Sequence, residues 1–125
     1  MELQEINTDL IIYNSSKFSD QKIICESRSI LPTLKEIDLE KVKLNPHFIE
    51  RILIQLHIPI WQMMNTDSAY YQMFNEHIDE LSPQELMKLC CDHPELLQSP
   101  IIISHQKSFI PKHITELFSL VCPIH

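Results

Sequence analysis

The sequence contains no glycine, although average usage of about 7% would give several in a chain of 125 residues. Gly-rich phosphate-binding loops need glycine because their backbone must approach the phosphate without an intervening Cβ atom. The absence of glycine therefore excludes the P-loop and Rossmann modes of binding ATP, GTP or NAD.

Long hydrophobic runs and an excess of basic residues are missing as well. No apolar run approaches the ~18 residues that span a bilayer, and the first residues, MELQEI, have neither the basic nor the apolar region of a secretory signal. Ten basic against 17 acidic residues give a net charge of −7, which repels phosphate backbones and anionic lipid. We therefore expect a cytoplasmic protein that binds neither nucleic acid nor a membrane. The hydrophobic fraction of 44% predicts one globular domain over residues 1–125.

The four cysteines are not arranged as a reactive pair. No C-x-x-C occurs, which excludes the usual dithiol redox motif and the common zinc knuckle. Cys90 and Cys91 lie on a predicted helix, and we expect both of them, as well as Cys25, to be packed in the core. Cys122 is the best candidate for an exposed thiol, and a thiol sensor that uses Cys122 or the 90/91 pair is an alternative. We predict no metal site and no cofactor, since His113, Cys122 and His125 fit no strong metal-ligand spacing.

Strand and helix patterns alternate at both ends of the chain. The predicted elements are strands at 9–13 and 33–39 with a helix at 17–31 between them, strands at 99–104 and 107–110, and a helix at 112–122. A β-α-β crossover makes the first two strands parallel, whereas a tight turn makes the last two antiparallel.

Three helices are predicted in the middle of the chain. Asn45 caps the first, which Pro59 stops, Thr66 caps the second, and Ser82 with Glu85 forms a capping box for the third. The predicted apolar face of the second helix is Ala69, Tyr70, Met73, Phe74 and His77. The whole pattern predicts an α/β fold of the thioredoxin type: a mixed four-stranded sheet flanked by helices, with a three-helix insert between strands 2 and 3 at about residues 45–98.

Several stretches resemble the arsenate reductase/Spx (ArsC-like) family of thioredoxin folds. SPQELMKLCCDHPELLQSPIIIS and KSFIPKHITELF are similar to the family's LSxxELxxxLxxHPxLLqRPIvv stretch, hairpin and terminal helix. EIDLEKVKLNPHFIERIL resembles its second strand with the insert helix, and LIIYNSSKFSD resembles its first strand with the catalytic loop. The resemblance covers nearly the whole chain.

The resemblance implies that the catalytic residues are missing. The family's nucleophilic cysteine follows the strand-end tyrosine by five residues, which places Phe18 at its position, and the second cysteine of Spx-like members falls at Gln21. The positions of the three arginines that hold the oxyanion in arsenate-reducing members fall at Asn65, Ser99 and Lys112. Because thiolate is the attacking species in this chemistry, we do not expect arsenate reduction.

Two interpretations are open for each residue near the positions of the missing catalytic groups. We expect Phe18 to fill the vacated pocket, with a gating or partner-binding aromatic as the alternative. We expect Ser16 and Ser19, together with Ser15, to cap the helix, with hydrogen bonding to a thiol such as glutathione as the alternative. The resemblance also implies a cis peptide bond before Pro100, beside the former substrate groove.

Our leading hypothesis is therefore a catalytically degenerate, non-enzymatic binding or regulatory protein with a protein partner, as Spx-like relatives act by docking on RNA polymerase. The alternative is an enzyme or thiol binder in which Ser16, Ser19, Pro100 and Lys112 engage glutathione or another small anion. We expect Trp61, with Met63 and Met64, to fill the core under a turn, with an adaptable binding surface as the alternative.

Overall fold

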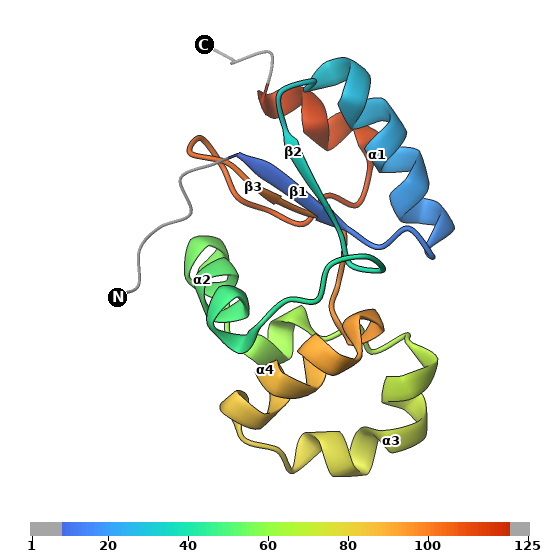
Figure 1. Ribbon diagram of the computed structural model, residues 1–125, viewed down its shortest axis with the longest axis vertical. Helices are drawn as coiled ribbons and strands as arrows, with labels where there is room; N and C mark the ends of the chain where they lie inside the picture. The colour runs from blue at the N-terminus through green and yellow to red at the C-terminus, as the bar shows by residue number, and fades with distance from the viewer. Residues whose placement is uncertain (1–8, 121–125) are drawn as a thin grey trace. The chain divides into compact units, whose positions relative to one another are not determined.

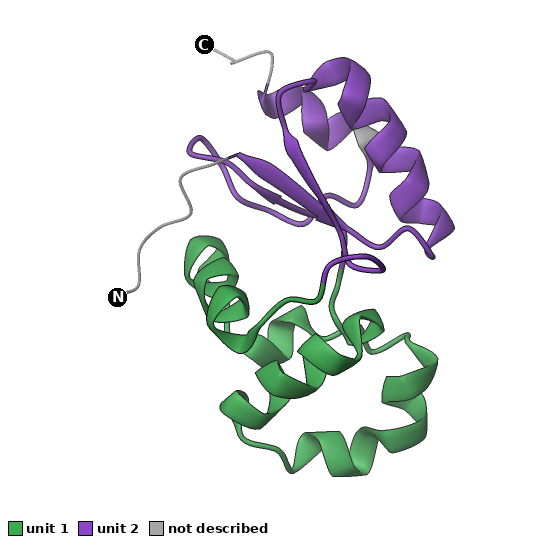
Figure 2. Ribbon diagram, viewed as in Figure 1, with its two compact units in different colours: residues 1–5, 43–98 green, residues 6–42, 99–125 purple. Residues whose placement is uncertain are grey.

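The computed structural model describes residues 9–120, apart from the side chain of Ile114 (Figure 1). The chain divides into two compact units. Among the described residues, the sheet unit contains residues 9–42 and 99–120, and the helical unit contains residues 43–98 (Figure 2). Each unit is described by itself.

The sheet unit is built on three strands, β1 (Leu10–Tyr13), β2 (Lys35–Asp38) and β3 (Ile101–Ile103). Their order is β2-β1-β3, and β1 pairs in parallel with β2 and antiparallel with β3. Helix α1 (Phe18–Ile30) makes the crossover from β1 to β2, as a parallel pair requires. The described fold is thus a small mixed sheet flanked by helices.

One face of the sheet, α1 and the 3-10 helix η3 (Ile114–Leu120) share a hydrophobic core (Figure 1). Its buried residues are Ile11, Tyr13, Ile23, Ile24, Ile102 and Leu117. Alternate strand residues point to the same face, which is why Ile11 and Tyr13 reach this core together. The central strand β1 is buried along its whole length.

The sheet of the described residues has three strands where the sequence predicted four. Phe109 pairs with Ile102 through two backbone hydrogen bonds of 2.8 and 2.9 Å, and this bridge stands alone. The turn before it is held by the hydroxyl groups of Ser104 and Ser108, which accept backbone N–H groups. Pro111 follows and has no N–H to continue a ladder. The helix predicted at 112–122 is a 3-10 helix at Ile114–Leu120, Lys112 and His113 lie before it, and the predicted residues 121–122 lie outside the described part of the chain.

The helical unit lies between β2 and β3 in the sequence. Its elements are α2 (Pro46–Leu56), η1 (Ile60–Met63), α3 (Ala69–Asp79), α4 (Pro83–Asp92) and η2 (Pro94–Leu96). Two of its predicted caps are confirmed. The Asn45 side chain accepts a hydrogen bond from the Phe48 N–H (2.8 Å) at the start of α2. Ser82 and Glu85 form the reciprocal capping box of α4.

Helix α3 departs from its prediction. Its cap is Ser68, whose hydroxyl accepts the Tyr71 N–H (3.1 Å), and Thr66 lies before it. The backbone at Phe74 is non-helical (φ −122°, ψ 22°), so a face drawn at a constant helical period does not continue through it. Ile78 is the buried residue of this helix. The predicted apolar face is wrong: Tyr70 is half-buried, and the other four residues are exposed.

Candidate functional site

The loop between β1 and α1 is organised by Asn14, whose side chain is buried. Its Oδ1 atom accepts hydrogen bonds from the backbone N–H of Ser16 (2.9 Å) and from the Ser16 hydroxyl (2.6 Å). The Lys17 N–H donates to the Asn14 carbonyl at 3.0 Å. These bonds form an Asx-type turn, which brings the chain from the strand to the helix start.

Asp20 attaches the first turn of α1 to the end of β1. This fully buried carboxylate accepts the Asn14 N–H at Oδ2 (2.9 Å), while its Oδ1 atom has no hydrogen-bond partner among the described residues. A carboxylate in the first turn interacts favourably with the helix dipole. The sequence analysis did not single out Asp20, because a charged residue on a helix is usually exposed.

Asp38, at the end of β2, supports the same loop from the neighbouring strand. Its Oδ1 atom accepts the N–H groups of Ser15 (3.2 Å) and Glu40 (3.0 Å). Burial opposes ionisation of this carboxyl, but the hydrogen bonds from Glu40 and Ser15 outweigh it and hold the pKa of Asp38 below its ordinary value. The loop is therefore fixed by three polar side chains, Asn14, Asp20 and Asp38, which the sequence analysis missed.

Phe18 is the first residue of α1 and is 75% exposed. The expectation that its ring fills a vacated pocket is wrong. The buried residues of α1 are Asp20, Ile23, Ile24 and Ser27, and a helical turn of 100° per residue directs position 18 away from that face. The Lys22 ammonium lies 6.0 Å from the ring centroid. Gln21 is also exposed, and its side-chain amide donates to the Ser15 carbonyl.

The serines do not cap α1. The N-cap residue is Lys17, which makes no side-chain capping bond, so the prediction of capping by Ser15, Ser16 or Ser19 is wrong. The hydroxyl of Ser16 is engaged by Asn14, and Ser19 is exposed.

Lys17 connects the loop to the segment that precedes β3. Its ammonium group donates to the Ser99 hydroxyl at 2.9 Å, and the Ser99–Pro100 peptide bond is cis. Pro100 is buried and Ser99 is half-buried. The structure thus places a lysine, which the sequence analysis did not select, beside Ser99, which the resemblance puts at one of the family's arginine positions.

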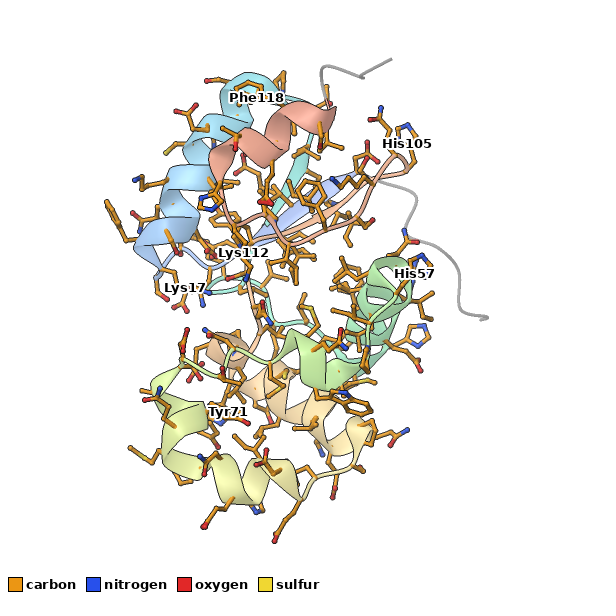
Figure 3. The ribbon with its side chains drawn as sticks, turned by 180° about the vertical axis from the view of Figure 1, so that it is seen from behind. Lys17, His57, Tyr71, His105, Lys112 and Phe118 are labelled. Atoms are coloured by element: carbon orange, nitrogen blue, oxygen red, sulfur yellow. The ribbon has the colours of Figure 1, made fainter. Side chains whose placement is uncertain are left out.

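The other two residues that the resemblance puts at arginine positions, Lys112 and Asn65, have different surroundings. Lys112 is exposed in the sheet unit (Figure 3). Its backbone N–H donates to the carboxylate of Glu116. Asn65 belongs to the helical unit, where its N–H donates to the Leu96 carbonyl at 2.7 Å and its Oδ1 atom accepts the Asp67 N–H at 3.2 Å. The described role of Asn65 is therefore to hold a turn within its own unit.

Two of the described thiols are buried and one is exposed. Burial, with a smaller contribution from Cys91, raises the pKa of Cys90 to about 12, and the Cys90 Sγ donates to the Met64 Sδ at 3.7 Å. Burial also raises the pKa of Cys91. The predicted core placement of this pair is confirmed. The prediction for Cys25 is wrong, because Cys25 is exposed on α1 and lines a surface hollow of about 330 Å³ with Phe18. Cys122 lies outside the described residues.

Within residues 9–120, no group of three or more His, Cys, Asp or Glu side chains could hold a metal ion. In the same part of the chain, no helix is both long enough and apolar enough to span a membrane.

Comparisons with known proteins show which family the chain resembles. The sequence profile of the ArsC family matches residues 14–111. The chain is 30% identical to an arsenate reductase of Haemophilus influenzae over 115 residues, which are 86% of this chain and 97% of that protein. It is 28% identical to the global transcriptional regulator Spx of Enterococcus faecalis over 94 residues, which are 66% of this chain and 71% of that protein.

A solved structure has a similar fold. The fold is similar to that of an arsenate reductase from Vibrio cholerae, with a TM-score of 0.71 and 16% identity over 92% of this chain and 98% of that chain. At this identity the likeness concerns the fold alone, which is the thioredoxin-like mixed α/β fold of these proteins. With the profile covering most of the sequence, the chain belongs to the ArsC family.

Proposed function

We propose that this ArsC-family chain is catalytically degenerate and acts as a non-enzymatic binding or regulatory protein with a protein partner. The observation that carries the proposal is the side chain at the helix start. The resemblance to the family puts Phe18 at the position of the nucleophile, and its side chain is 75% exposed. Thiolate is the species that attacks in thiol-dependent reduction, and a phenyl ring cannot replace it.

The intact loop supports binding as the retained role. Asn14, Asp20 and Asp38 hold the strand end and the helix start in place through hydrogen bonds of 2.6–3.2 Å, although the loop between them contains no thiol. The buried Cys90 and Cys91, whose pKa values are raised, are poor substitutes for the missing nucleophile. A relative from Enterococcus faecalis that is 28% identical is named a global transcriptional regulator, which is consistent with regulation through a partner protein.

The proposal is tested by two measurements on the purified full chain. Arsenate-dependent oxidation of a thiol reductant is expected to stay at the level of a blank without protein. Affinity capture followed by reconstitution with the purified candidate partner is expected to give a stoichiometric complex in sedimentation velocity. Turnover of arsenate, or the lack of any reconstitutable complex, would contradict the proposal.

A second candidate is a binder of glutathione or a similar small anion, and one observation favours it. The Lys17 ammonium lies 2.9 Å from the hydroxyl of Ser99, the residue that precedes Pro100, and a cation near a helix start attracts carboxylates. Calorimetric titration with glutathione tests it. Saturable binding at millimolar or lower concentration that Lys17→Ala abolishes would support this candidate, and the absence of heat would reject it.

A further inference from the structure

We propose that an apolar groove of the helical unit binds a segment of a partner protein that carries a large apolar side chain beside lysine or arginine. The proposal rests on the proposed function, since it names the chemistry of the partner. It concerns residues that lie outside the β1–α1 loop.

The groove has a volume of about 580 Å³ and lies along α2 and α4. On the α2 side, Glu50, Ile54 and His57 line it, and their spacing of four and three residues places them on one helix face. Pro83 and Met87, four residues apart, line it from α4. His57, at the end of α2 in Figure 3, takes a left-handed conformation (φ 59°) that ends the helix. The residues that follow it, 58–61, also line the groove.

The groove exposes large apolar side chains that the fold leaves unburied. Trp61 is 61% exposed and Ile54 is 50% exposed. The 3-10 helix η1 buries Ile60 and Met63, so the residue that follows Ile60 is directed outward. The predicted core role holds for Met63 and Met64, which are buried, and is wrong for Trp61. Tryptophan contributes strongly when a partner covers it, because it buries a large rigid surface at a small cost in side-chain entropy.

The charges around the groove favour a cationic occupant. Glu50 is the one acidic residue in the groove lining, which includes no lysine or arginine. Helix α2 has no basic residue in its last turn, so no such charge offsets the partial negative end of the helix dipole there. Residues 43–98 contain eight aspartates and glutamates against three lysines and arginines. A basic segment with a large apolar side chain matches both the apolar lining and the negative charge of this unit. An amphipathic helix bound in a groove is a recurrent form of such recognition.

A short amphipathic peptide of leucine and lysine at helical spacing is the probe, with the full chain as receptor. Trp61 is the only tryptophan of the sequence, so its emission reports on the groove directly. We expect a saturable blue shift, because the indole leaves water when the peptide covers it. Ile54→Asp is expected to weaken binding by about tenfold or more, and Glu50→Gln to weaken it by roughly threefold and to reduce its salt dependence.

Two variants on α3 are the matched controls. Met73→Asp and Glu76→Gln repeat the same changes at exposed positions outside the groove lining, and binding to both is expected to stay within about twofold of the parent. Equal weakening by groove and control variants would overturn the proposal. Absence of a Trp61 shift, or equally tight binding of a leucine and glutamate peptide, would overturn it as well.

The two proposals fail separately. A reconstituted partner complex that Ile54→Asp leaves unchanged would reject the groove and leave the proposed function standing. Turnover of arsenate would reject the proposed function without affecting the peptide measurement.

Discussion

Truncation of Phe18 distinguishes an exposed ring from a ring that fills a pocket. Phe18→Ala is expected to change the free energy of unfolding by about 0.5 kcal/mol or less. The ring is 75% exposed, so about a quarter of the ~1.5–3 kcal/mol for complete burial is at stake, which is roughly 0.4–0.8 kcal/mol. The better helix propensity of alanine, by up to about 0.7 kcal/mol, offsets this loss.

The measurement is urea unfolding followed by far-UV circular dichroism. The matched control is Ile102→Ala, which removes a fully buried side chain from the same unit and is expected to cost about 2–5 kcal/mol. A ring packed in a pocket would lose about 3–5 kcal/mol on truncation. A loss for Phe18→Ala comparable to that of the control would therefore refute the reasoning.

Two further predictions concern the loop and the thiols. Because the pKa of Asp38 is lowered in the folded protein, its stabilising contribution is present above the unfolded value of about 3.9 and is lost as pH falls through the folded value. In the Asp38→Asn variant, the free energy of unfolding should fall less steeply on acidification, as measured by urea unfolding across that pH range. An unchanged pH dependence would contradict the assignment. In native protein, iodoacetamide should modify Cys25 and spare Cys90 and Cys91, since one thiol is exposed and two are buried. Peptide mass spectrometry reads this out, and equal modification of Cys90 and Cys25 before unfolding would count against the burial.

The caps of α2 and α4 could be predicted because their hydrogen bonds are local, whereas the predicted caps of α1 and α3 were wrong. Asn45 and the Ser82–Glu85 pair bond to backbone groups three residues away, and this geometry follows once the helix starts there. The parallel arrangement of β1 and β2 followed in the same way from the crossover between them. The missing fourth strand depended instead on which backbone groups the turn hydroxyls of Ser104 and Ser108 engage, and a hydrophobic pattern does not report this.

The orientation of α1 could not be predicted from hydrophobicity alone. Its buried face includes Asp20 and Ser27, which are polar, whereas the apolar Phe18 and the thiol of Cys25 lie outside it. Asp20 is buried because it bonds the Asn14 N–H at the end of β1, and that contact exists only after the strand and the helix have packed. The signal that could have found it is an acidic residue in the first helical turn shortly after a turn-forming asparagine.

The most direct test of the central claim is the rate at which the purified chain reduces arsenate in the presence of a thiol reductant, with an active arsenate reductase as positive control. The absence of a thiol at Phe18 predicts a rate no different from the protein-free blank. Sustained arsenate-dependent oxidation of the reductant by this chain would show that another group supplies the nucleophile, and would contradict the account of lost catalysis.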